Sequence, residues 1–205
     1  MAGRGLAPLV AGVLQWCCAR MWGYRPVMIA HIVERKGAIG ALRWFMANMP
    51  RYLMTMHVLG PIRTHLSCLV ISLYNGCRYC AYGHGYALEL LYLRDRDRLF
   101  PLDARDVDGW LGLEPRVLGD RMRGLLQDAG MHREAIWVDR TLDLLSGDHQ
   151  PADPAEARLA HLVTMIGEMN GIAVAAGVEP DGAQNPINKN VRIRARNDEL
   201  RAAAV

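Results

Sequence analysis

The chain has 205 residues, of which 51% are apolar and 22% charged, and its formal net charge at pH 7 is +3. This composition is ordinary for one globular domain with a sizeable core. So small a charge gives no electrostatic reason to expect a nucleic-acid partner, and we expect a surface of mixed sign.

The first 30 residues form an apolar stretch that contains the run "LAPLVAGVLQWCC". No A-x-A-like cleavage site follows it, and it is short for a bilayer span of about 20 residues. We therefore predict that residues 1–30 hold a helix that packs on the domain or on a neighbouring subunit. A targeting segment is the alternative, and we expect no membrane partner.

Residues 31–182 are predicted to form the main helical domain, because proline and glycine punctuate apolar runs of helical period. The first helices are expected over 25–37, 38–49, 50–60 and 61–76. Within the last of these, "CLVISLY" is rich in β-formers, but the length of the run and its starting proline favour a helix over a buried strand. The methionines of this region are predicted to fill the core: Met46, Met49, Met54 and Met56.

Further helices are predicted to begin near residue 77 and to cover 116–130, 131–147 and 153–177. Asp153 is a plausible N-cap of the last one, with Pro154 in its first turn. The stretch after Gly177 has few apolar residues, so we predict it to be extended or partly disordered, with a C-terminal tail over 183–205. The predicted fold is all-α.

The segment "NGCRYCAYGHGYALEL" has the spacing C-x2-C-x3-H. On a helix that starts near residues 75–77, Cys77, Cys80 and His84 lie on one face. Cys77 lies in the first turn, where free N–H groups and the helix dipole stabilise a thiolate. A histidine one turn further can take a thiol proton. The pattern is typical of a thiol–disulfide or peroxidatic centre with one thiolate, one resolving thiol and one base.

Two other interpretations of this segment stay open. The same three residues could bind zinc with His65 or His57 as a fourth ligand, although the usual second C-x2-C or H-x3-5-H pair is absent. They could also be a buried thiol pair beside a core histidine. The chain has five cysteines, an odd number, and the other three lie in apolar runs, so we expect a reducing, cytoplasmic environment.

The stretch "LVISLYNGCRYCAYGHGYALE" resembles the signature of the alkylhydroperoxidase D-like family, the carboxymuconolactone decarboxylase superfamily. The stretch "HLVTMIGEMNGIAVAAGVEPD" resembles the closing helix of that family. The resemblance is specific over residues 55–95 and looser over 30–182. It implies an all-helical bundle that assembles into homo-oligomers, which would offer the N-terminal helix a partner surface.

The activity that this resemblance implies is reduction of hydroperoxides, or dithiol–disulfide exchange, with a thiol electron donor that is a protein and with no cofactor. Carried over to this chain, Cys80 attacks the peroxide, a more exposed Cys77 resolves the sulfenic acid, and His84 is the base. The physics of the helix N-terminus instead favours Cys77 as the more acidic thiol.

The chain departs from the family pattern at two positions. His65 stands where members with peroxidase activity carry a glutamate, twelve residues before the first cysteine, and Tyr79 stands where the best-studied pattern has a histidine. His65 either relays protons in place of the glutamate or marks a weak or lost peroxidase activity. Two alternatives therefore remain: the acid–base chemistry of the decarboxylase branch, which does not depend on a C-x-x-C pair, and a non-catalytic, metal-stabilised oligomer.

Overall fold

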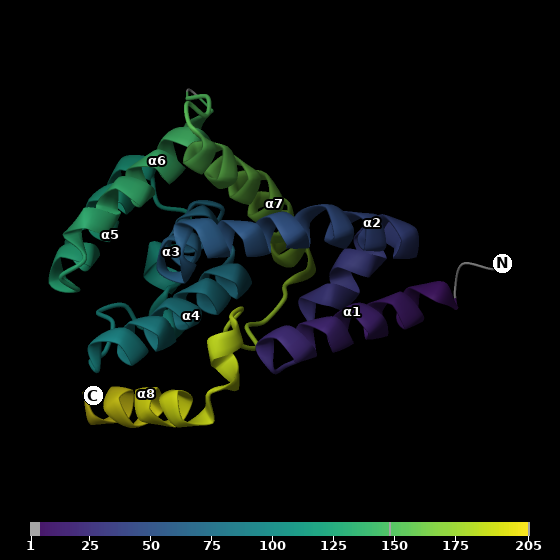
Figure 1. Ribbon diagram of the computed structural model, residues 1–205, viewed down its shortest axis with the longest axis horizontal. Helices are drawn as coiled ribbons and strands as arrows, with labels where there is room; N and C mark the ends of the chain where they lie inside the picture. Colours follow the sequence, from purple (N-terminus) through teal and green to yellow (C-terminus); the bar gives the residue numbers. More distant parts are fainter. Residues whose placement is uncertain (1–4, 148, 205) are drawn as a thin grey trace.

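The structure is a computed structural model that describes residues 5–147 and 149–204. Within these residues the fold is all-α, as predicted, and contains no strand. Eight α-helices follow one another along the chain (Figure 1): α1 (Leu6–Trp22), α2 (Met28–Leu59), α3 (Pro61–Tyr74), α4 (Arg78–Arg96), α5 (Pro115–Asp128), α6 (Ala135–Ser146), α7 (Pro154–Ala176) and α8 (Val191–Ala203). Four short 3-10 helices join them: Ala104–Asp106, Asp108–Trp110, His132–Glu134 and Pro186–Lys189.

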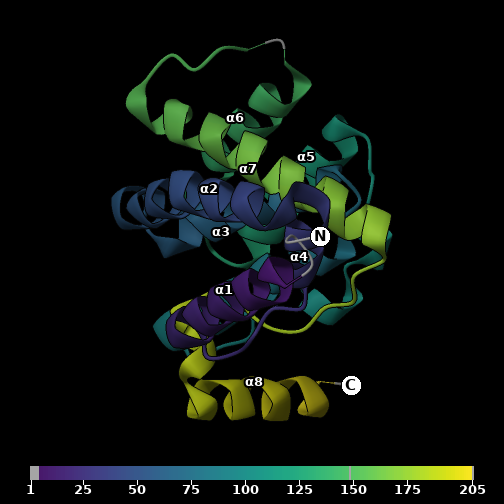
Figure 2. The same ribbon diagram turned by 90° about the vertical axis from the view of Figure 1, so that its right-hand side faces the viewer.

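Helices α3 and α4 lie at the centre of the molecule. Ten consecutive residues of α3, from Thr64 to Leu73, are buried, and so is nearly every residue of α4 from Tyr79 to Leu93. Both views place α6 at one end of the molecule and α8 at the opposite end, with α3 and α4 between them (Figures 1 and 2). The apolar run "CLVISLY" is therefore helical, and it is β-rich in composition because a fully buried helix needs apolar side chains on every face.

The helix predicted to end before Pro50 does not end there. Helix α2 runs from Met28 to Leu59, with Pro50 inside it and one non-helical residue at Gly37 (φ 71°, ψ 163°). Gly37 interrupts the helix as predicted, because glycine adopts a positive φ without strain. Pro50 removes only one backbone hydrogen bond, and the turns after it are held by burial of Tyr52, Thr55 and Leu59.

The exposed faces of α1 and α2 correct a prediction about the methionines. Met46 is 77% exposed and Met54 is 50% exposed, so these two do not fill the core. They share the exposed face of α2 with Ile39 and Val58, and Trp16 on α1 is exposed as well. The inner face of α1, formed by Val10, Leu14, Cys18 and Trp22, packs in one apolar cluster with α2.

By length and composition alone, α7 is the one helix in the described part of the chain that could cross a membrane. It packs against α2, α3 and α6, and Leu162 on its inner face is fully buried. Replacing Leu162 by alanine should lower the free energy of unfolding by about 2–5 kcal/mol, because the substitution leaves a cavity in the core. Urea denaturation measures this change. Val174→Ala on the same helix, where the side chain is 54% exposed, is the matched control, with an expected change below about 0.5 kcal/mol.

The second half of the stretch after Gly177 is folded, so the prediction of an extended or partly disordered tail is wrong there. Residues 186–189 form a 3-10 helix, and α8 follows. Ala183 and Ile187 join an apolar cluster with residues of α4. The composition was misleading because the segment buries polar side chains by hydrogen bonding them: Asn185, Asn188 and Asn197.

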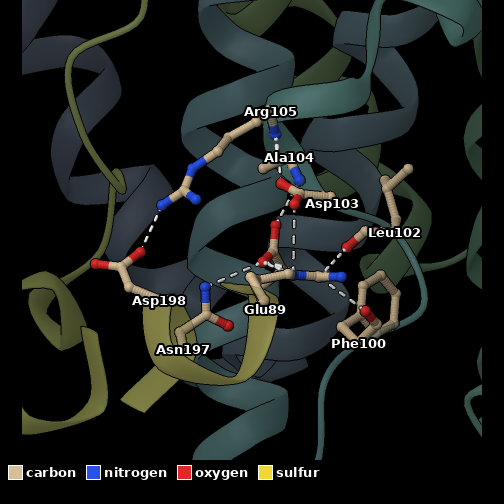
Figure 3. Close-up of polar contacts among 9 residues, drawn as sticks. Glu89, Phe100, Leu102, Asp103, Ala104, Arg105, Asn197 and Asp198 are labelled. Carbon is tan, nitrogen blue, oxygen red and sulfur yellow. Dashed lines mark hydrogen bonds and ion pairs between the residues drawn. The ribbon is translucent and has the colours of Figure 1, made fainter. Parts of the chain in front are cut away.

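A buried ion pair between Glu89 of α4 and Arg201 of α8 holds the C-terminal helix against α4 (Figure 3). Glu89 is 2% exposed and accepts hydrogen bonds from the backbone N–H of Ala104 (2.5 Å), Nη2 of Arg201 (2.9 Å) and Nδ2 of Asn197 (3.3 Å). Nη2 of Arg201 also donates to the carbonyl oxygens of Phe100 and Leu102, at 2.8 and 2.6 Å. Burial raises the pKa of Glu89 to about 7, although the Arg201 charge acts in the opposite direction.

Candidate functional site

The two thiols of the C-x2-C motif lie at the start of α4. Cys77 is the N-cap residue, with extended backbone (φ −94°, ψ 96°), and its N–H donates to the carbonyl oxygen of Ser72 at 2.9 Å. Gly76, with φ 67°, makes the tight entry that the sequence indicated. The Cys77 sulfur accepts the backbone N–H of Cys80 at 3.5 Å, so the thiol takes the place that an oxygen fills in an ordinary N-cap.

The pKa values of the two thiols move in opposite directions. A hydrogen bond from the Cys80 side chain, together with backbone N–H groups, lowers the pKa of Cys77 against the effect of burial. The same hydrogen bond to Cys77, and then burial, raise the pKa of Cys80 well above its usual value. Cys77 is therefore the more acidic thiol of the pair and Cys80 the less acidic, which agrees with the helix N-terminus argument and not with the assignment implied by the family resemblance.

Both thiols are buried, and Cys77 is only slightly the more exposed of the two. Cys77 is 1% exposed and Cys80 is 0% exposed. They belong to an apolar cluster that also contains Leu14 and Cys18 of α1 and Ile32 of α2. The N-terminal helix therefore takes part in covering the thiol pair.

The structure pairs His84 with His65, and not with a thiol. The Nδ1 atoms of the two rings are 3.1 Å apart, and the side chains are 1% and 0% exposed. Nδ2 of Asn185 lies 2.7 Å from Nε2 of His65. Within the described residues no hydrogen bond joins His84 to Cys77 or Cys80, so a role of His84 as base, directly or through a water, stays a prediction.

Burial keeps both imidazoles neutral. It lowers the pKa of His65 from 6.5 to about 3, and burial followed by the neighbouring His65 lowers the pKa of His84 well below its usual value. A histidine whose pKa is lower in the folded state stabilises the fold above pH 6.5, and that contribution is lost as the pH falls.

The protonation of His65 alone should therefore lower the free energy of unfolding by about 2 kcal/mol when the pH falls from 7 to 5. Urea denaturation at several pH values measures this slope. The His65→Gln variant should show a smaller slope than the wild type, whereas His57→Gln, on an exposed part of α2, should keep the wild-type slope. Equal slopes in all three proteins would contradict the assignment of a buried neutral His65.

The residues proposed as zinc ligands do not assemble. Among the described residues, no group of three or more His, Cys, Asp or Glu side chains is placed to hold a metal ion. His84 turns to His65, and His57 is exposed on α2. The donor set of the zinc interpretation therefore does not fit this geometry.

Sequence reasoning missed several polar residues that surround the site. Tyr79 donates to the Asp181 carboxylate at 3.3 Å, the Val27 N–H donates to the same oxygen at 2.8 Å, and Tyr24 donates to the carbonyl oxygen of Gly182 at 3.2 Å. Asp181 ends the "GVEPD" motif and was visible in the sequence as part of the closing segment. Asn185 carried no such signal, because it stands in a stretch whose composition predicts disorder.

A narrow pocket lies beside His84. Apart from Tyr79, His84 and Gln184, most of the residues that line it are apolar or aromatic, including Trp22, Met28, Phe45 and Met165. Trp22 and Met28 also belong to the apolar cluster that holds the two thiols, so the pocket borders the site.

No family model, curated protein or solved structure gives a significant match to this chain.

Proposed function

We propose that this protein is a thiol-dependent oxidoreductase related to the alkylhydroperoxidase D-like family, in which Cys77 and Cys80 cycle between dithiol and disulfide. The observation that carries the proposal is the position of the Cys77 sulfur at the N-cap of α4, where it accepts the backbone N–H of Cys80 at 3.5 Å. This arrangement supplies one thiol with a lowered pKa and one adjacent resolving thiol. The proposal assigns the attack to Cys77.

The Cys77 thiolate attacks the terminal oxygen of a hydroperoxide, the O–O bond breaks, and Cys77 becomes a sulfenic acid. The alkoxide that leaves takes the proton of the Cys80 thiol and becomes an alcohol. The Cys80 thiolate then attacks the Cys77 sulfur, and the hydroxide that leaves takes up from the solvent the proton that Cys77 released on ionisation, so that it departs as water. A thiol reductant, itself oxidised to a disulfide, returns both cysteines to the reduced state.

A small hydroperoxide suits this site better than a protein disulfide does. Both sulfurs are covered, and α1 shares in the cover, so a protein substrate would need the cover to open first. The protein thiol that reduces the disulfide faces the same barrier.

The test is peptide mass spectrometry of the reduced protein after one equivalent of cumene hydroperoxide. Rapid, stoichiometric formation of a Cys77–Cys80 disulfide is the expected result. The outcome that sinks the proposal is that both thiols stay reduced over the time in which free thiol reacts. A non-catalytic role for the buried pair would then be the better account.

We also propose that the protein is a homo-oligomer. The exposed apolar side chains on α1 and α2 support this proposal, since a monomer rarely leaves such a surface in water. Light scattering after size exclusion should give a mass of two or more chains, and a monomer would overturn the proposal. Replacing Trp16 and Met46 by glutamate should lower that mass.

A further inference from the structure

The side-chain amide of Asn185 has a fixed orientation. Its Oδ1 accepts the N–H of Ile187 at 2.8 Å, and its Nδ2 lies 2.7 Å from Nε2 of His65 and 3.7 Å from Sδ of Met56. If the oxygen and nitrogen of this amide exchanged places, its NH2 group would face the N–H of Ile187, which is also a donor. The contacts of Nδ2 with His65 and Met56 would then be lost. Nδ2 of Asn185 is therefore the donor to His65.

The segment that carries Asn185 is seated closely on α4. The N–H of Gln184 donates to the carbonyl oxygen of Gly83 at 3.1 Å. A Cβ atom at Gly83 would lie only 2.8 Å from Nε2 of Gln184, so a larger residue would displace the Gln184 side chain. Glycine at position 83 thus leaves room for Gln184 beside α4.

The direction of this hydrogen bond sets the tautomers of both histidines. Nε2 of His65 accepts from Asn185, so the proton of this neutral ring is on Nδ1. That proton points to Nδ1 of His84, 3.1 Å away, which must accept it. The proton of the neutral His84 ring is therefore on Nε2.

The Nε2 atom of His84 is buried and has no hydrogen-bond partner among the described residues. The ring lines the narrow apolar pocket beside the thiol cluster. A buried donor without an acceptor is costly, and an acceptor brought by a ligand would remove that cost. The pocket has a volume of about 30 Å³, which is room for about one water molecule.

We propose that Asn185 fixes the protons of the buried histidine pair, so that His84 presents Nε2–H as a hydrogen-bond donor at the edge of the pocket. Asn185 is the positioning residue that holds His84 in the donor state. The expected role of His84 is thereby reversed, from a base to a donor. This inference does not rest on the thiol chemistry, and it stands or falls by its own experiment.

The first measurement is 15N NMR of the imidazole nitrogens in the wild-type protein, which distinguishes protonated from unprotonated ring nitrogens. We expect Nε2 of His84 and Nδ1 of His65 to be protonated and the other two nitrogens to be unprotonated. The reverse pattern would overturn the proposal, and no variant is needed for this result.

The Asn185→Asp variant tests the cause. An aspartate can accept from Ile187 and also from Nε2–H of His65, which reverses both tautomers and leaves Nε2 of His84 unprotonated. In this variant we expect Nε2 of His65 and Nδ1 of His84 to be protonated and the other two ring nitrogens to be unprotonated. A merely structural role for Asn185 would leave the wild-type pattern in every molecule that still folds.

Discussion

Replacing Cys77 by serine should slow the reaction with cumene hydroperoxide at pH 7 by at least about 100-fold, because each pKa unit changes the thiolate fraction about tenfold. The remaining Cys80 loses the effect of the Cys77 thiol on its pKa, but burial still raises that pKa and disfavours the thiolate. Cys80→Ser should keep a fast first step and accumulate a sulfenic acid on Cys77. Stopped-flow kinetics and dimedone trapping with peptide mapping measure the two effects.

Cys17→Ser is the matched control for this pair, because Cys17 is a half-buried cysteine on α1 outside the C-x2-C motif. Its reaction rate should equal that of the wild type. A fast reaction of the Cys77→Ser variant, with dimedone on Cys80, would reverse our assignment and support the order that the family resemblance implies.

Replacing Arg201 by alanine should lower the free energy of unfolding at pH 8 by about 3–5 kcal/mol, the range found when one partner of a buried ion pair is removed. Glu89 is 2% exposed and would lose its countercharge. The loss should be smaller at pH 5. Glu89, with a pKa of about 7, is protonated there in the folded protein, so no unpaired charge has to be buried.

Urea denaturation of the wild type and of Arg201→Ala at both pH values measures this difference. Arg105→Ala is the control, because Arg105 pairs at the surface with Asp198 of α8, the helix that carries Arg201. Both side chains of this pair are about half exposed. An exposed pair contributes about 0–1 kcal/mol and should show little change with pH. A loss for Arg201→Ala that is the same at pH 5 and pH 8 would contradict the raised pKa of Glu89.

The local rules of helix formation were readable from the sequence. Pro61 begins α3, Pro154 follows the Asp153 N-cap of α7, and Gly37 interrupts α2 where the sequence placed a break. The start of α4 at the C-x2-C motif was also predicted, and with it the more acidic character of Cys77. These features depend on neighbours a few residues away, so the sequence determines them directly.

Contacts between residues far apart in the chain were decided only by the tertiary structure. Nothing in the spacing of the motif shows that His84 meets His65 rather than a thiol, or that Asn185, 120 residues after His65, fixes their protons. The segment from Gln184 to Arg201 has a polar composition, and composition predicts order only through apolar burial. Its order comes instead from hydrogen bonds and one buried ion pair, whose partners on α3 and α4 are brought within reach only when the helices pack.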